Sequence, residues 1–182
     1  MTRRLLGVAA TIATTLVVAG CDSSPAAPAS TPTPTTAVIA GPTAIDPCLV
    51  ATWKSTGISG TITIGGAKVA ITGGVGEVLT IGAGGTIKTD ETNTTPVKGS
   101  AADGTQYTLL QTGTATGKIA SSAEKISVTL DQPTTLTVAL LKNGVQVQSQ
   151  HPGSASDSYT CSAGTSLTIT GGGGTVSRYS PG

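Results

Sequence analysis

Residues 58–81 read ISGTITIGGAKVAITGGVGEVLTI, and hydrophobic side chains alternate with small or polar ones along this stretch. Ile62 and Ile64 fall on one face of an extended chain, and Val69 and Ile71 do the same after a pair of glycines. Strict alternation indicates strands with one buried face, and glycine pairs between such segments favour tight turns. The stretch therefore predicts consecutive antiparallel strands.

The same pattern continues through the rest of the chain. Asn143-Gly144 is the strongest hairpin signal, and the glycine pairs are too unevenly spaced for a solenoid repeat. We predict an all-β fold of about ten short strands, either an antiparallel barrel or a sandwich. An up-and-down barrel is favoured, because the strands follow one another through short turns and closure removes exposed edges. Alternating segments of this kind include YTLLQT, KISVTL, TLTVALL, VQVQS, SLTIT and TVSRY.

The composition excludes some classes of protein. Only 10% of the 182 residues are charged, which argues against helical bundles and coiled coils. The formal net charge of the whole chain is +1. The segment from Cys21 onward has 8 basic and 9 acidic residues, so its net charge is −1. A chain this close to neutral lacks the basic surface of nucleic-acid-binding proteins, so no nucleic-acid partner is expected.

Residues 1–20 have the layout of a secretory signal peptide. Two arginines near the start precede the charge-free, apolar run 5–18, which is shorter than a typical membrane span. The run ends in VAGC at 18–21, which resembles the lipobox of bacterial lipoproteins. That resemblance implies cleavage before Cys21, a diacylglycerol with palmitate-type chains on its sulfur, and a lipid-anchored protein on the extracytoplasmic face of the cell membrane. An ordinary signal peptide with a chance cysteine is the alternative.

Residues 21–44 form the next segment, rich in Pro, Thr, Ser and Ala. This composition has too little apolar surface to fold and predicts a tether. Residues 22–44 would reach about 70 Å when extended, or about 25–30 Å as a random coil. The Thr-Pro run 31–36 resembles O-glycosylated segments of actinobacterial lipoproteins, and an unmodified tether fits equally well. The folded β-barrel domain is then expected over 45–182.

Cys48 and Cys161 are the other two cysteines. In an oxidising compartment, two cysteines near the ends of one domain are expected to pair, with free thiols or an intermolecular bond as alternatives. Such a bridge would enclose the 112 residues 49–160. In the chain-entropy model, a disulfide that closes a loop of this length stabilises the folded state by about 4–5 kcal/mol. His151 is the only histidine and no Cys-x-x-Cys occurs, so no metal site is predicted.

Trp53 ends the segment PCLVATW at the start of the first predicted strand, and Arg178 lies in TVSRY in the last. This placement resembles the lipocalins, although Ala51 stands where they carry a glycine. The resemblance implies that the Trp53 indole packs over the closed end of a barrel under the Arg178 guanidinium, a cation–π contact of about 0.5–2 kcal/mol. The order of the motifs also resembles exported actinobacterial lipoproteins of uncharacterised function. A core tryptophan in an unrelated sandwich is the alternative.

Candidate catalytic groups are few. His151 lies in a loop with Ser149, Ser154 and Asp157, which makes a Ser-His-Asp hydrolase a remote alternative to a solvated histidine.

Glycoside chemistry requires a pair of carboxylates, and the chain has acidic residues that could supply one. Asp90, Glu91 and Asp103 could supply such a pair, but turn and surface roles explain them equally.

The chain is therefore expected to be non-enzymatic, with no cofactor. Two functions stay open: a module that binds a small apolar or amphiphilic ligand, and a structural or interaction protein of the envelope with a filled barrel. A cavity of about 300 Å³ or more lined by Val, Leu and Ile favours the first function. A filled barrel with an exposed apolar patch favours the second. The sequence does not name the ligand-binding residues.

Overall fold

The computed structural model describes residues 45–182, so the predictions for the signal peptide, Cys21 and the tether lie outside the described residues. One short 3₁₀ helix, η1 (Pro47–Leu49), precedes the strands. The strands are β1 (Thr52–Ile64), β2 (Ala67–Gly73), β3 (Val78–Ile81), β4 (Thr86–Asp90), β5 (Val97–Ala101), β6 (Gln106–Thr112), β7 (Thr114–Ser122), β8 (Lys125–Leu130), β9 (Thr137–Lys142), β10 (Val145–Gln150), β11 (Ser154–Ser162), β12 (Ser166–Thr170) and β13 (Val176–Pro181).

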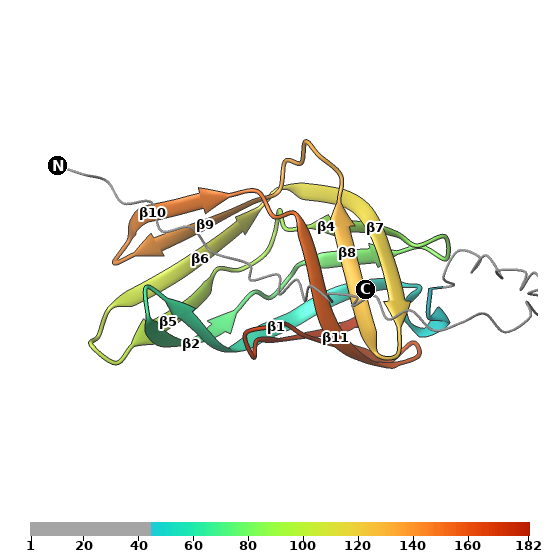
Figure 1. The fold of residues 1–182 in the computed structure, drawn as a ribbon, viewed down its shortest axis with the longest axis horizontal. Coiled ribbons are helices and arrows are strands. Elements are labelled where there is room, and N and C mark those ends of the chain that lie inside the picture. The colour runs from blue at the N-terminus through green and yellow to red at the C-terminus, as the bar shows by residue number, and fades with distance from the viewer. Residues whose placement is uncertain (1–44) are drawn as a thin grey trace, which may run out of the picture. The chain divides into compact units, whose positions relative to one another are not determined.

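Eight of these strands close an antiparallel barrel, which confirms the predicted fold class. From β1, the hydrogen-bonded order is β13, β12, β11, β8, β7, β4 and β3, and β3 pairs again with β1. The other five strands extend from β1 in the order β2, β5, β6, β9 and β10. We call these five strands the extension; Figure 1 shows them to one side of barrel strands β4, β7, β8 and β11.

The barrel differs from a simple up-and-down barrel in its connections. The chain leaves the barrel after β1, β4 and β8 to form extension strands, and it returns at β3, β7 and β11. The short turns predicted from sequence join real neighbours such as β1 and β2 or β3 and β4. They do not show which strands belong to the barrel.

Strand β1 belongs to both parts of the sheet. Its first residues, 52–54, pair with β3, whereas 58–64 pair with β2. Gly60 lies on the second part with a φ of 145°, and a Cβ there would lie 2.5 Å from the Gly174 carbonyl oxygen. Because a side chain would collide with this backbone, the close packing of β1 on the β12–β13 turn requires glycine.

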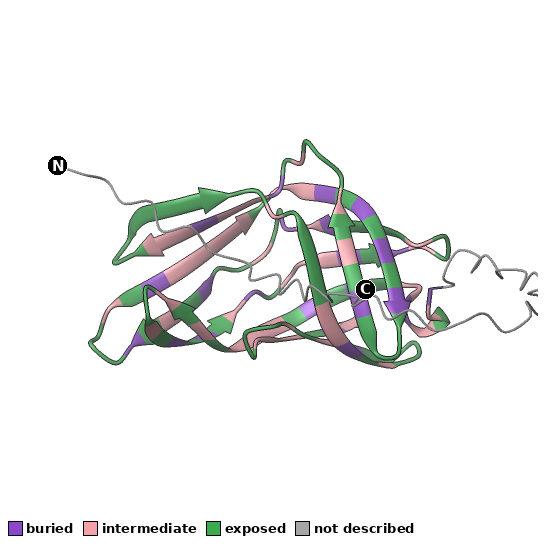
Figure 2. Cartoon of the chain, viewed as in Figure 1, coloured by how far each residue is buried: buried purple, intermediate pink, exposed green. Residues whose placement is uncertain are grey.

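The buried side chains form two cores. Alternation along the strands places one set inside the barrel and another on the inner face of the extension. Figure 2 shows buried and exposed residues alternating along β7, whereas β10 is exposed throughout. The barrel core includes Leu49, Trp53, Leu79, Ile87, Ile119, Ile126, Tyr159, Leu167 and Tyr179, and the extension core includes Val69, Ile71, Val97 and Tyr107.

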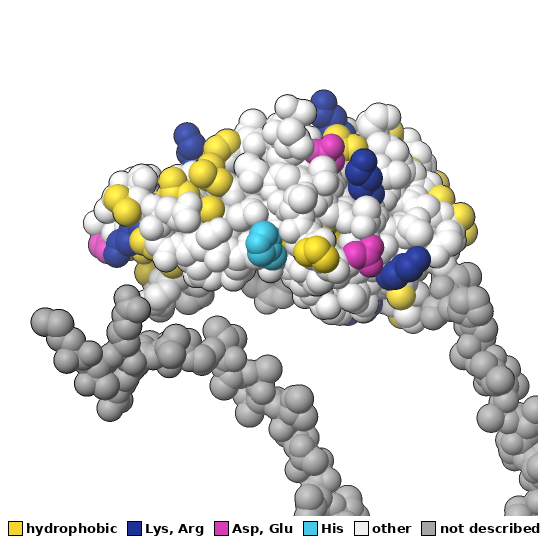
Figure 3. Space-filling model, turned by 90° about the horizontal axis from the view of Figure 1, so that it is seen from above, with side chains coloured by type: hydrophobic (Ala, Val, Ile, Leu, Met, Phe, Trp, Pro, Cys, Tyr) yellow, Lys and Arg dark blue, Asp and Glu magenta, His cyan; other side chains and the backbone are white. Residues whose placement is uncertain are grey.

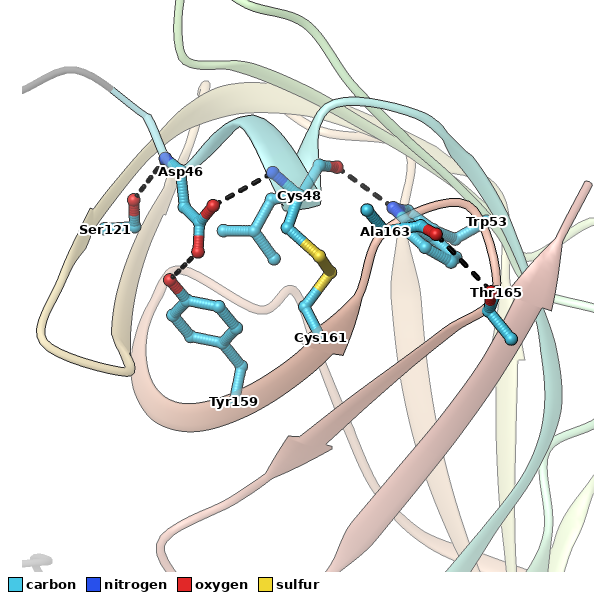
Figure 4. The surroundings of a disulfide bond; sticks show 9 residues. Asp46, Cys48, Trp53, Ser121, Tyr159, Cys161, Ala163 and Thr165 are labelled. Carbon is cyan, nitrogen blue, oxygen red and sulfur yellow. Dashed lines mark hydrogen bonds between the residues drawn. A yellow bond between two sulfur atoms is a disulfide. The ribbon is translucent and has the colours of Figure 1, made fainter.

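One end of the barrel is closed by η1 and its surroundings (Figure 4). The Asp46 carboxylate accepts hydrogen bonds from the Cys48 N–H and the Tyr159 hydroxyl, at 2.9 and 2.7 Å, and these bonds hold the pKa of Asp46 below its usual range. The Cys48–Cys161 disulfide joins η1 to β11, with its Cα atoms 6.1 Å apart, which confirms the predicted bridge. Trp53 is completely buried, and its indole N–H donates to the Leu49 carbonyl at 2.9 Å.

Within residues 45–182, no helix is long and apolar enough to cross a membrane.

We expect Trp53→Ala to lower the free energy of unfolding by about 3–5 kcal/mol, because it empties a completely buried site. Urea denaturation followed by circular dichroism measures the change. Val147→Ala on the exposed strand β10 is the control and should change stability by less than about 0.5 kcal/mol. Wild-type tryptophan emission should be blue-shifted and protected from acrylamide; red-shifted, fully quenched emission would contradict the buried indole.

Candidate functional site

The barrel interior contains a cavity of about 310 Å³. All eight barrel strands contribute residues to its lining, and β6 and β9 of the extension add Gln111 and Val138. Most of the wall is aliphatic, with Leu79, Ile87 and Ile119 among its buried members. The cavity therefore meets the size and lining that were expected to favour a binding module.

The charged groups in this lining are all acidic. Glu77, Glu91 and Asp157 line the cavity, and its wall contains no Lys, Arg or His. The exposed fraction of Glu91 is only 3%. An ionised carboxylate at this depth is expensive unless it is paired with a cation or shifts its pKa.

Strand alternation explains why two of these carboxylates face inward. Glu77 is two residues before the buried Leu79 on β3, and Glu91 is two residues after the buried Thr89 on β4. Leu79 pairs with Thr89 across the two antiparallel strands. Continuing that register by two residues in each strand places Glu77 opposite Glu91. Like charges at directly opposite positions destabilise a sheet.

Hydrogen bonds hold the first of these carboxylates. Glu77 Oε1 accepts a bond from the Thr89 hydroxyl at 3.0 Å, and Glu77 Oε2 accepts one from the Tyr179 hydroxyl at 2.9 Å. These bonds favour the charged form, but burial outweighs them and raises the pKa of Glu77. Burial and the nearby acid also raise the pKa of Tyr179 well above its usual range, so its hydroxyl remains a donor.

Glu91 is less well satisfied. Its Oε1 accepts a long hydrogen bond of 3.3 Å from the Gln111 amide. Burial, followed by repulsion from Glu77, raises the pKa of Glu91 from 4.5 to about 7, and the nearby Thr94 hydroxyl acts in the opposite direction. No hydrogen bond joins the Thr94 hydroxyl to the Glu91 carboxylate, and both Glu91 Oε2 and Thr94 Oγ1 lack a hydrogen-bond partner within residues 45–182.

A second hollow continues from the barrel along the extension. It has a volume of about 290 Å³ and shares Ile58, Gln111, Val138 and Ser177 with the barrel cavity. Its other walls are mainly aliphatic side chains of the extension core, among them Ile62, Ile71, Val97 and Leu109. The two hollows are therefore adjacent, and Glu77 and Glu91 line only the barrel cavity.

The barrel-floor pair predicted from the lipocalin resemblance is only partly right. Trp53 is buried at the closed end, but Arg178 is exposed and donates a hydrogen bond to the Ser59 hydroxyl at 3.1 Å. Tyr179, the next residue on β13, takes the inward position. The cation–π prediction is therefore wrong: alternation turns Arg178 to the outer face, whereas Trp53 faces the interior.

The residues considered for a hydrolase do not form a triad. His151 is exposed, and its Nδ1 lies 2.8 Å from the Leu136 carbonyl oxygen. No hydrogen bond joins its ring to Ser149, Ser154 or Asp157 within the part of the chain that the structure describes.

The acidic residues considered from sequence fall into two groups. Asp90 and Asp103 accept hydrogen bonds from nearby backbone N–H groups in exposed turns, as the turn interpretation predicts. Glu91 is instead buried in the cavity, and the residue opposite it, Glu77, was not singled out from the sequence.

We expect the free energy of unfolding of the wild type to decrease as the pH rises from 5 to 8. Over this range native Glu91, with a pKa of about 7, binds a proton that the unfolded chain, with a pKa near 4.5, releases. The contribution of Glu91 to stability is therefore highest below pH 4.5. It decreases by about 2–3 kcal/mol as the pH rises through 7, and it is constant above that.

The variant Glu91→Gln should remove most of this dependence and be more stable than wild type at pH 8. Urea midpoints at pH 5 and pH 8 measure both effects. Glu124→Gln, in an exposed turn, is the matched control and should retain the wild-type slope. Equal pH profiles for wild type and Glu91→Gln would contradict the assignment.

Residues 45–182 contain no group of three or more His, Cys, Asp or Glu residues placed to hold a metal ion. Comparison of the chain with protein-family models, with curated proteins and with solved structures finds no match.

Proposed function

We propose that the chain is a non-enzymatic envelope lipoprotein whose barrel binds a small amphiphilic molecule. The observation that carries the proposal is the cavity of about 310 Å³, lined by all eight barrel strands. Small-molecule sites are typically concave, about 300–1,000 Å³ in volume, and mostly apolar with a few convergent polar groups. This cavity has all three properties, since Glu77, Glu91, Tyr179 and Gln111 provide the polar groups in an aliphatic wall.

The arrangement of the two barrel ends supports binding from one side. The η1 end is filled by Leu49 and Trp53, neither of which lines the cavity. At the opposite end, the wall includes Pro152 and the exposed Ala155. A ligand would therefore enter from the end where the extension joins the barrel and place its apolar part inward.

The cellular place of this module is part of the proposal and is supported by the sequence. VAGC at 18–21 follows a charge-free apolar run, as at the processing site of bacterial lipoproteins. Two acyl chains on Cys21 would anchor the protein stably to the membrane, whereas one chain gives only marginal binding. A tether over 22–44 would then present the barrel near the extracytoplasmic face, where amphiphilic molecules are found.

A second candidate function, an interaction protein of the envelope, is favoured by strand β10. This strand is the free edge of the extension, and Val145 and Val147 are 67% and 56% exposed. Figure 3 shows hydrophobic side chains gathered near the extension, whereas charged ones are scattered. An unprotected edge can pair with another strand. The open cavity favours the binding module over this alternative.

Ligand binding predicts saturable uptake of a neutral apolar probe. N-phenyl-1-naphthylamine should bind wild type with about 1:1 stoichiometry and increased fluorescence. Val128→Phe, which adds volume to a half-buried wall position, should weaken binding by at least about tenfold. Val147→Phe, outside the cavity, is the matched control. Unsaturable binding, or equal effects of the two variants, would contradict a site inside the barrel.

Membrane anchoring predicts a specific effect of Cys21→Ala in the native envelope. The variant should accumulate as precursor and lose labelling by a radioactive or clickable fatty acid, since the thiol that accepts the lipid is gone. Cys48→Ala is the control for cysteine loss and should keep the label. Full labelling of Cys21→Ala would rule out this anchor.

A further inference from the structure

From the cavity, we infer that the ligand carries a cationic amine, and that its ammonium group binds the Glu91 carboxylate beside Glu77 while its hydrocarbon part enters the barrel. This inference deepens the proposed function and rests on it. It adds a head-group class and names the residues that recognise it.

The first support is an unbalanced acidic wall. Glu77, Glu91 and Asp157 face the cavity, and no basic side chain lines it. Buried carboxylates normally have a cationic partner or a full set of hydrogen bonds. Glu91 is 97% buried and its Oε2 has neither within residues 45–182. An ammonium group would supply both the charge and the missing donor.

The second support is the proximity of two carboxylates directly beyond the paired ends of β3 and β4. The register of Leu79 with Thr89 places Glu77 opposite Glu91, where like charges repel each other. Tyr179 and Thr89 already donate to both oxygens of Glu77. The open acceptor is therefore on Glu91, and a single cation beside it would also relieve the repulsion from Glu77.

The third support is the position of this pair along the barrel. Ile81, at one end of β3, donates its N–H to the Ala51 carbonyl beside η1, whereas Glu77 precedes the other end of the strand. The carboxylates therefore lie away from the closed end. Between them and Trp53 the wall is aliphatic, with Leu79 and Ile87 buried. The acidic groups near the opening would attract the ammonium group of an alkyl amine, and the apolar wall farther in would contact its alkyl chain. The same acidic groups would repel an alkyl carboxylate.

A metal ion fits the same wall less well. No group of three or more possible metal ligands occurs among residues 45–182, and the hydroxyl donors of Tyr179 and Thr89 already occupy Glu77. Most of the surrounding lining is hydrocarbon, which a hydrated divalent ion would not fill. An organic cation uses both the carboxylate and the apolar wall.

The proposal predicts a dependence on pH. The groups that face Glu91 are Glu77 and Tyr179 across the sheet, Gln111 from β6, Thr94 and Asp90 in its own loop, and Asp157 across the cavity; none of them is basic. Below its pKa of about 7, Glu91 is protonated and loses most of its attraction for a cation. Binding of an alkyl amine should therefore tighten from pH 5 to pH 8, and binding of the neutral alcohol should not.

The test compares three probes with the same chain: octylamine, 1-octanol and octanoate. Each competes with N-phenyl-1-naphthylamine for the full folded domain at pH 8. We expect octylamine to bind at least about tenfold more tightly than 1-octanol, since a hydrogen bond to a charged group contributes at least that factor, and octanoate to bind most weakly. Glu91→Gln should abolish the preference for octylamine over 1-octanol. Glu124→Gln is the matched control and should behave as wild type.

The possible outcomes separate this inference from the proposed function. If 1-octanol binds in the cavity but octylamine binds no better, the cationic head group is wrong and the binding module stands. If Glu91→Gln keeps the octylamine preference, the recognising residue is wrong. If the fluorescent probe does not bind saturably, the binding module and this inference both fall. Tryptophan emission of each variant confirms that Trp53 remains buried.

Discussion

The fold depends on one shared strand. β1 pairs with β13 along one edge, and along its other edge it pairs first with β3 and then with β2. The change of partner occurs at Ser55, whose N–H donates to the Glu77 carbonyl, whose carbonyl accepts from Gly76, and whose hydroxyl donates to Gly74. These bonds hold the β2–β3 loop against β1 at the point where the extension leaves the barrel.

The same junction creates the acidic site. The loop that leaves β2 returns to β1 at Ser55, and this places Glu77 directly before β3, in the inward phase of Leu79. The β3–β4 hairpin then brings Glu91 opposite it. Barrel closure and the proximity of the two carboxylates therefore both follow from the bonds at Ser55 and the β3–β4 register, and Glu77 and Glu91 each lie next to a paired strand.

Local patterns could predict much of this molecule, whereas non-local pairings could not. Period-two alternation predicts the positions of the strands. The spacing of Glu77 from Leu79 and Ile81 also predicts that its side chain lies on the same, inward face. A hairpin across Gly84-Gly85 would also have predicted the position opposite it. Alternation does not show which strands close the barrel, and so the cavity and the burial of Glu91 were not predictable. The predicted contact of Arg178 with Trp53 was wrong for a simpler reason. Tyr179, the next residue, faces the interior, so Arg178 faces outward.

The two ends of the barrel contribute in opposite directions to stability. At the closed end, the Cys48–Cys161 bridge joins residues 113 positions apart. By restricting the unfolded chain, it raises the free energy of unfolding by about 4–5 kcal/mol. Trp53 packs there without exposed surface. At the other end, Glu91 keeps a raised pKa and an unpaired oxygen, both of which destabilise the native state at neutral pH. Natural proteins tolerate such groups mainly where function uses them, as at binding sites. The stable closed end therefore compensates for an open end at which, in our proposal, a bound cation would supply the missing partner of Glu91.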